Sequence, residues 1–274
     1  MSTASSTPTG SPSAVKSRAS GTAPVPPLPL YGMHVRMLLT ETLRIPIAVI
    51  GTMAFPALSL LFFVVPNRVV ADDPVFATQA VASLSVFAVM VSALFNLGLT
   101  IAENREKPWD PYLRSLPLPA PVRIAAQLSA TALLSFLSLV PVLIVGAVAT
   151  EATVSAGGLA LGLVVLALTS IPFLLLGAAI GYAFSSKAAI AVIQVGMFSF
   201  AFGGGLFFPP QFFPQWLELL SRFFPSRSAR ELTLAAVRGV APEWWMLAGA
   251  IIWTLATAAL VLWLYRRDEG RRYR

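Results

Sequence analysis

The chain contains no cysteine, a single histidine and few charged residues. Without cysteine it can form no disulfide, thiolate metal site or redox pair. His34 alone excludes a metal site built from several histidines. Charged residues make up only 11% of the chain and hydrophobic residues 57%, against about 25% and about 45–50% in an average soluble domain. This shortage of polar surface predicts an integral membrane protein.

The motifs that mark nucleotide-binding, hydrolytic and metal sites are missing as well. The sequence has no GxxxxGK[ST] phosphate loop, no GxSxG turn and no HExxH pair. No pattern of interleaved aromatic and basic residues suggests a nucleic-acid groove, so cytoplasmic basic loops explain the net charge of +7 better. We therefore expect no metal, no cofactor and no nucleic-acid partner for this chain.

Long apolar runs are what the chain does have. Each is close to the roughly 20 residues that a helix needs to cross a bilayer. No Asp, Glu, Lys or Arg lies well inside any of them, which argues against an ion-coupled secondary transporter. The sequence predicts an all-α membrane protein with six transmembrane helices, at about Ile45–Val65, Phe76–Ile101, Ile124–Thr150, Gly157–Phe184, Ala188–Phe208 and Trp245–Tyr265.

Two different segments precede the first predicted span. Residues 1–30 are mostly Ser, Thr, Ala, Pro and Gly, a composition that predicts a disordered tail. Tyr31–Arg44 places Val35, Leu38, Leu39, Thr42 and Leu43 on one side of a helix and His34, Arg36, Thr40, Glu41 and Arg44 on the other. This pattern predicts an interfacial amphipathic helix, the alternative being a polar start to the first span. The expected organisation is a tail (1–30), a six-span domain (31–270) and a basic C-terminal tail (271–274).

A dense charge cluster separates the second and third apolar runs. Its members are Glu103, Arg105, Glu106, Lys107, Asp110, Arg114 and Arg123. Because even one charge at the bilayer centre costs about 2.5–3.5 kcal/mol, these residues belong to an aqueous loop. If the N-terminus is cytoplasmic, the inner segments hold 14 Lys and Arg residues and the outer segments 5. This bias predicts cytoplasmic termini and a cytoplasmic loop.

The last outer segment, from Pro209 to Trp244, is unusually apolar for a loop. We expect one or two short helices there that re-enter the outer leaflet or cap the bundle, after the break that Gly203, Gly204 and Gly205 allow. Phe207, Phe208, Phe212, Phe213 and Trp216 are candidates for an apolar external gate or substrate path. The alternative is that these rings only anchor the segment in the membrane.

Small and polar residues inside the spans predict helix packing. The pairs Gly158/Gly162 and Gly177/Gly181 allow close helix contact, which we expect to lie within the chain rather than at a dimer seam. Asn96 and Gln194 are expected to form hydrogen bonds between helices rather than to contact a ligand.

Residues 104–117 (NREKPWDPYLRSLP) resemble the cytoplasmic loop of type-2 ABC exporter permeases. Arg105, Glu106, Leu113 and Pro117 match that family's pattern in register, whereas the acid Asp110 lies one place early. A second similarity covers the segment from Gly205 to Gly239, before the last span. The resemblance extends over residues 31–270.

The resemblance implies a membrane subunit of an ATP-driven exporter, located in the cytoplasmic membrane of a prokaryote. ATP and magnesium would bind to a separate ABC ATPase subunit, so the chain itself would not be an enzyme. The family also implies a second permease chain, the same or homologous, and amphipathic drugs, antibiotics or lipid-like compounds as substrates. A short cytoplasmic coupling helix would dock on the ATPase, and its candidate residues are Glu103, Arg105, Glu106, Asp110 and Leu113.

Three alternatives remain open at this point. The charge cluster could be a solvated loop that only sets the topology. The protein could be a membrane-embedded enzyme that modifies lipids, although no intramembrane acid, base or metal cluster is evident. It could also be a membrane scaffold that transports nothing.

Overall fold

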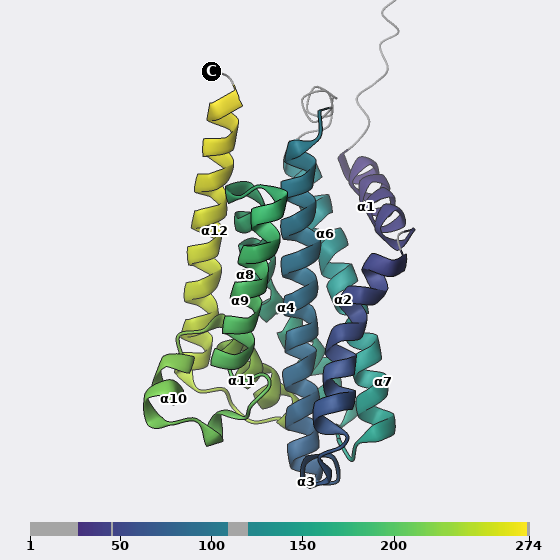
Figure 1. The fold of residues 1–274 in the computed structure, drawn as a ribbon, viewed down its shortest axis with the longest axis vertical. Helices are drawn as coiled ribbons and strands as arrows, with labels where there is room; N and C mark the ends of the chain where they lie inside the picture. Colours follow the sequence, from purple (N-terminus) through teal and green to yellow (C-terminus); the bar gives the residue numbers. More distant parts are fainter. Residues whose placement is uncertain (1–26, 45, 109–119, 273–274) are drawn as a thin grey trace, which may run out of the picture.

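A computed structural model describes residues 27–44, 46–108 and 120–272 of the 274-residue chain. This described part is helical, without a strand, as predicted (Figure 1). The N-terminal half contains α1 (Pro27–Leu43), α2 (Pro46–Ser59), the π-helix η1 (Leu60–Val64), α3 (Arg68–Ala71), α4 (Pro74–Glu106), α6 (Ala120–Leu137) and α7 (Leu139–Ala149). The C-terminal half contains α8 (Ala156–Ala183), α9 (Ser186–Gly203), η2 (Pro210–Phe212), α10 (Gln215–Ser221), α11 (Pro225–Arg238) and α12 (Trp244–Arg272).

Five helical segments in the described residues are long and apolar enough to cross a membrane. They are Pro74–Glu106, Ile124–Ala149, Ala156–Ala183, Ser186–Gly203 and Trp244–Asp268. These correspond to the second to sixth predicted spans. The first predicted span, Ile45–Val65, coincides with α2 and η1, of which Met53–Val64 forms a shorter apolar helix. The total of six spans therefore stays a prediction.

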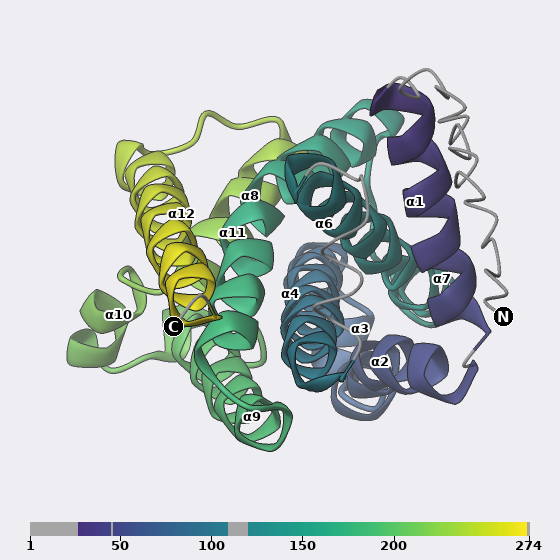
Figure 2. The ribbon, with the colours of Figure 1, turned by 90° about the horizontal axis from the view of Figure 1, so that it is seen from above.

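The amphipathic segment before the first span is helical, and α1 begins at Pro27, inside the stretch predicted to be the tail. It packs on α6, at the edge of the bundle (Figure 2). The Tyr31 hydroxyl donates a hydrogen bond to Ser129 Oγ at 2.7 Å. Two residues depart from the predicted sides: His34 is half-buried and Leu43 is exposed. The interfacial position of α1 stays a prediction.

The central element is α4, which contacts α2, α6, α7, α8, α9 and α11. Its most apolar stretch is 72% buried, whereas that of α12 is only 6% buried. The helix starts sharply because the Asp73 carboxylate accepts hydrogen bonds from the amides of Val75 and Phe76, and Pro74 occupies the first helical position. A helix surrounded in this way is suited to carry a displacement from one end of the bundle to the other.

Glycines set the distance between α4 and α8. A Cβ atom on Gly177 would lie 2.9 Å from the Ala93 carbonyl oxygen, and one on Gly181 would lie 2.6 Å from the Gly98 carbonyl oxygen. The other pair, Gly158 and Gly162, packs against Val237 of α11 in the same chain. Both pairs therefore serve packing within the chain, as predicted.

Asn96 was predicted to form a hydrogen bond to another helix, and this prediction is wrong. Its side-chain amide donates to Ser92 Oγ at 2.8 Å, one turn earlier in the same helix. A serine four residues away offers an acceptor without any constraint from a neighbouring helix. Gln194, on α9, is exposed.

Candidate functional site

The charge cluster begins as a continuation of α4 and not as a separate loop. Glu103, Arg105 and Glu106 form the last turn of the helix, which ends at Lys107 with extended backbone angles. Pro108 follows, and a proline disfavours the helical conformation in the residue before it. This span was predicted to end at Ile101 because charges begin at Glu103, yet a helix can extend from a bilayer into water. Asp110 and Leu113 lie outside the described residues.

Arg105 joins α4 to two other helices. Its guanidinium donates to the Asp268 carboxylate of α12 from Nε (3.1 Å) and Nη2 (2.7 Å). Its Nη1 donates to the backbone oxygen of Gly181 at 2.9 Å, close to the end of α8, and to that of Phe184. The last carbonyls of a helix have no partner within the helix, so Arg105 also caps α8. The pair is largely shielded, since the Arg105 side chain is 23% exposed and that of Asp268 8%.

Glu106 joins the same turn of α4 to α9. Its carboxylate accepts hydrogen bonds from the Ser186 amide at 2.9 Å and from the Ser186 hydroxyl at 2.7 Å. Ser186 is the first residue of α9, where free amides and the helix dipole favour a negative group. Arg105 and Glu106 together connect the end of α4 to α8, α9 and α12.

Two acids near the end of α4 differ from the sequence-based prediction. Asp268 was missed because the last span was expected to end at Tyr265, whereas α12 continues to Arg272. Its one sequence signal is that it is an acid directly after two arginines. Glu103, which was predicted to act with Arg105, is exposed on the same turn.

The five aromatic residues predicted to form a gate do not lie together. Phe207 packs in the bundle, with ring centroids 4.9 Å from Phe87 of α4 and 5.2 Å from Phe202 of α9. Phe213 is half-buried. The other three point outward, with exposed fractions of 61% for Phe208, 74% for Phe212 and 67% for Trp216. The gate stays a prediction, and within one chain only Phe207 contacts the core.

The turn between α9 and η2 explains this division. Gly205 has a φ of 75°, in the left-handed region that favours glycine. A Cβ atom there would lie 2.5 Å from the Pro210 ring. The tight turn places Phe207 against α4 and carries the following residues outward, to α10 at the edge of the bundle (Figure 1).

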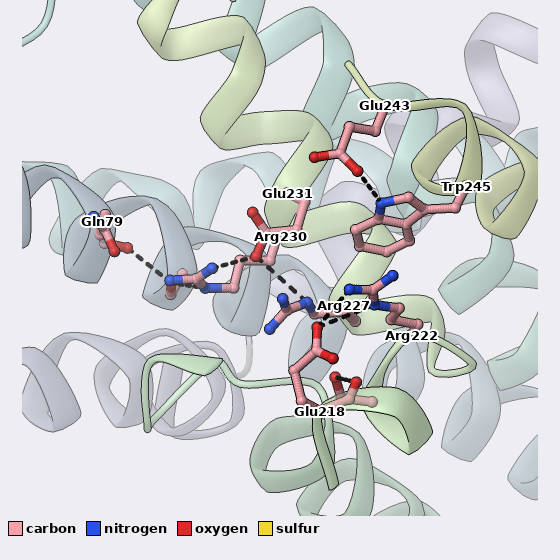
Figure 3. A network of polar contacts seen from close by, with 10 residues as sticks. Gln79, Glu218, Arg222, Arg227, Arg230, Glu231, Glu243 and Trp245 are labelled. Carbon is pink, nitrogen blue, oxygen red and sulfur yellow. Dashed lines mark hydrogen bonds and ion pairs between the residues drawn. The ribbon is translucent and has the colours of Figure 1, made fainter. Parts of the chain in front are cut away.

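A second charged group, which was not predicted from the sequence, lies at the same end of the bundle as α10 (Figure 3). We call it the α10–α11 arginine cluster; it consists of Glu218, Arg222, Arg227, Arg230 and Glu231. Arg227 and Arg230 are buried. Burial lowers the pKa of each guanidinium, and the nearby Glu231 carboxylate opposes that effect. The signal in the sequence was the spacing of Arg227, Arg230 and Glu231, which gathers them on one side of α11.

Arg105 and Arg230 lie towards opposite ends of α4. Arg105 belongs to its last turn, whereas Arg230 of α11 donates from Nε to Ser83 Oγ at 2.8 Å, in its first third. A helical bundle with several apolar helices of bilayer length and charged contacts towards both ends defines a multi-pass membrane protein.

Comparison with known sequences shows to which family of membrane proteins the chain belongs. The sequence model described as "ABC-2 family transporter protein" matches residues 71–265, which is most of the chain. The chain therefore belongs to the ABC-2 transporter family. It is also similar to YvfS of Bacillus subtilis (strain 168), a protein named as a transport permease. The two are 25% identical over 233 residues, an alignment that covers 85% of this chain and 95% of YvfS.

Proposed function

We propose that the chain is the membrane-spanning permease subunit of an ATP-driven exporter that moves amphipathic or hydrophobic compounds across the cytoplasmic membrane. A separate ABC ATPase subunit binds ATP and magnesium, and a second permease chain, identical or homologous, completes the path. Family membership and the similarity to YvfS support a transport permease. One observation carries the mechanism: the last turn of α4 is bonded to α8, α9 and α12.

This observation gives Arg105 and Glu106 a role within the chain. The coupling segment predicted between α4 and α6 follows directly after Lys107, so a displacement by the ATPase reaches the end of α4 first. The bonds to Gly181, Ser186 and Asp268 then carry the displacement to three further helices. Glu103 and Asp110 remain the candidates for direct contact with the ATPase.

The opposite part of α4 links this movement to the predicted gate. Phe87 of α4 packs edge-on against Phe207, which stacks on Phe202 of α9. A shift of α4 relative to α9 therefore changes the packing of Phe207. In the proposed mechanism this change opens an apolar path between two permease chains, whose aromatic lining suits an amphipathic compound.

The test begins with co-purification of an ABC ATPase from the native membrane, followed by reconstitution of the complex in vesicles. The variant Glu106→Gln should retain assembly and ATP hydrolysis, while export of a hydrophobic dye per ATP falls about tenfold. A glutamine keeps the size of the side chain but lacks the charge that the two Ser186 donors favour.

The matched control is Glu41→Gln, which changes another exposed acid, on α1, that has no proposed role in coupling. It should not weaken the contacts of α4 with α9. Equal export by the Glu106→Gln variant and the wild-type complex would contradict the coupling role. Failure to recover any ATPase would contradict the proposed function itself and favour a lipid-modifying enzyme or a scaffold.

A further inference from the structure

The α10–α11 arginine cluster carries more positive charge than its acids neutralise. The cluster has three arginines and two glutamates. Basic residues that determine topology are concentrated on the cytoplasmic side, whereas this segment is predicted to be external. Two of the arginines are also inside the protein, where the side chain of Arg227 is 9% exposed and that of Arg230 4%. Topology does not account for arginines in this position.

The Glu231 carboxylate is the ion-pair partner of both buried guanidiniums, those of Arg227 and Arg230. Oε1 of Glu231 accepts from Nη1 of Arg230 and lies 3.4 Å from Nε of Arg227. Arg230 also donates a hydrogen bond from Nε to Ser83 Oγ. The Ser83 hydroxyl in turn donates to the Gln79 backbone carbonyl oxygen. The other acid of the cluster, Glu218, is already bonded to Arg222 at 2.8 and 3.0 Å. Arg230 is thus well supplied with acceptors and Arg227 is not.

Two N–H donors of the Arg227 guanidinium are therefore left without a hydrogen-bond acceptor among the described residues. These donors, on Nε and Nη1, are both buried. A guanidinium stays charged in a protein and offers five donors in one plane. A buried donor without an acceptor is destabilising, and more so if it is charged. An anion with several oxygens, above all a phosphate group, supplies acceptors in the paired geometry that arginine prefers.

The surroundings of Arg227 have features typical of a bilayer surface. Next to it, α10 and the following turn expose the apolar side chains of Trp216, Leu219, Leu220 and Phe223. Arg222 lies 5.2 Å from the centre of the Trp245 ring, and tryptophan is enriched where bilayer and water meet. Figure 3 shows Arg227 between Arg230 and Glu231 on one side and Glu218 and Arg222 on the other.

We propose that Arg227, beside Arg222, binds a phosphate group at the external end of the permease. The arrangement favours the phosphate of an anionic lipid headgroup, because the apolar face of α10 holds this region at the membrane surface. Free phosphate shares the chemistry and is the other source to be tested. The site is independent of which compound is exported.

The experiment compares the thermal stability of the purified full-length chain in two kinds of lipid nanodisc. One contains phosphatidylcholine alone, and the other contains phosphatidylglycerol in addition. Tryptophan fluorescence reports the unfolding, and native mass spectrometry counts retained phosphatidylglycerol molecules. The anionic lipid should raise the melting temperature of the wild type by about 2–4 °C, as expected for a ligand that binds only the folded state.

Three variants decide the role of Arg227. Arg227→Gln should lose the increment and retain one lipid fewer, whereas Arg238→Gln, with the same charge change at an exposed position of the same helix, should keep both. Arg227→Lys retains the charge without the planar fork and should lose most of the increment; it also serves if the glutamine variant does not fold. A full increment in either Arg227 variant would overturn the proposal.

A parallel series in neutral detergent identifies the source of the phosphate. Inorganic phosphate, compared with chloride at equal ionic strength, should stabilise the wild type less than the lipid does. An equal effect of phosphate that depends on Arg227 would support the same site with a soluble anion as its ligand. No effect of either phosphate or phosphatidylglycerol on the wild type would refute the site.

Discussion

At the scale of single residues, two arginines that look alike in the sequence have different environments. Arg105 has as acceptors a carboxylate and carbonyls at the end of a helix that have no partner within that helix, so its charge is matched by partners from two elements. Arg227 shares one carboxylate with Arg230. A buried charge contributes to stability only if its partners are complete. The difference makes Arg105 a structural connection and Arg227 a candidate ligand-binding group.

The contact between Arg105 and Asp268 can be measured directly. Replacing Asp268 by Asn keeps the shape of the side chain but removes the charge that faces the guanidinium. We expect a loss of about 1–3 kcal/mol of unfolding free energy, because the pair is largely shielded from water. The measurement is thermal or denaturant unfolding of the purified protein.

The control for this pair is Asp72→Asn. Asp72 accepts a hydrogen bond from Arg68 at 3.2 Å, but these side chains are 57% and 72% exposed. An exposed pair contributes about 0.2–1 kcal/mol, so this variant should be close to the wild type. Equal losses for both aspartates would show that Asp268 does not hold α12 to α4.

At the scale of elements, the seam between α4 and α8 determines how closely the central helices approach. Gly98 of α4 and Gly177 and Gly181 of α8 each lie against the backbone of the other helix. Without a hydrophobic force between helices in lipid, such close contact is a main source of their association. The seam also keeps Gly181 within reach of Arg105.

A methyl group at this seam should be poorly tolerated. We expect Gly177→Ala to lower the unfolding free energy by about 1–3 kcal/mol, since its Cβ atom would lie 2.9 Å from a backbone oxygen that cannot move alone. Gly196→Ala on α9 is the matched control, because nothing lies within 4 Å of its added Cβ atom. Gly196→Ala should leave stability unchanged or raise it slightly. A similar stability of the two variants would mean that α4 and α8 can separate without loss.

The segment after α9 is the element in which gating and anchoring can be distinguished. Cysteine replaces Phe208 or Phe213 in a chain that has no other cysteine. If these rings close an apolar path between two permease chains, their labelling by a soluble maleimide should differ between nucleotide-free and nucleotide-trapped complexes. Phe208 is exposed in a single chain, so the second chain would cover it in one state and not in the other.

A cysteine at Val69 of α3 provides the reference. Val69 is 78% exposed at the same end of the bundle and belongs to an element with no proposed role in gating. Its labelling should be the same in both states. Labelling of Phe208 and Phe213 that also stays constant, together with normal export by their alanine variants, would leave the segment only an anchoring role.

At the scale of the whole molecule, the described basic residues divide between the two ends of the bundle. The turn of α4 with Arg105 lies at the same end as the C-terminus, together with α1, whereas α3 and α10 lie at the opposite end (Figure 1). The division agrees with the expected cytoplasmic position of the C-terminal end, which still requires a test.

The sidedness can be tested with two single cysteines. In intact cells, a maleimide that cannot cross the membrane should label a cysteine at Val69 and should not label one at Lys107 until the membrane is permeabilised. The physical reason is the preference of Lys and Arg for the cytoplasmic side. The reversed pattern would invert the topology, and with it the external position of the α10–α11 arginine cluster.

The sequence by itself determined the properties that can be read along one dimension. The shortage of charge indicated a membrane protein. The apolar runs predicted six spans, and five of them correspond to described helices that are long and apolar enough to cross a membrane. The loop motif around Arg105 indicated the family, and the spacing of Gly177 and Gly181 indicated a close helix contact. These features could be predicted because a bilayer imposes its thickness and polarity on each segment separately.

Only the tertiary structure decided which residues meet. Arg105 and Asp268 are 163 positions apart, and no local pattern pairs them. The burial of Arg227, the inward position of Phe207 among outward-facing rings and the partner of Asn96 were equally beyond the sequence. Such contacts depend on how each helix is rotated about its axis and where it ends. Those are set by the joint packing of all neighbouring side chains, and no single segment contains that information.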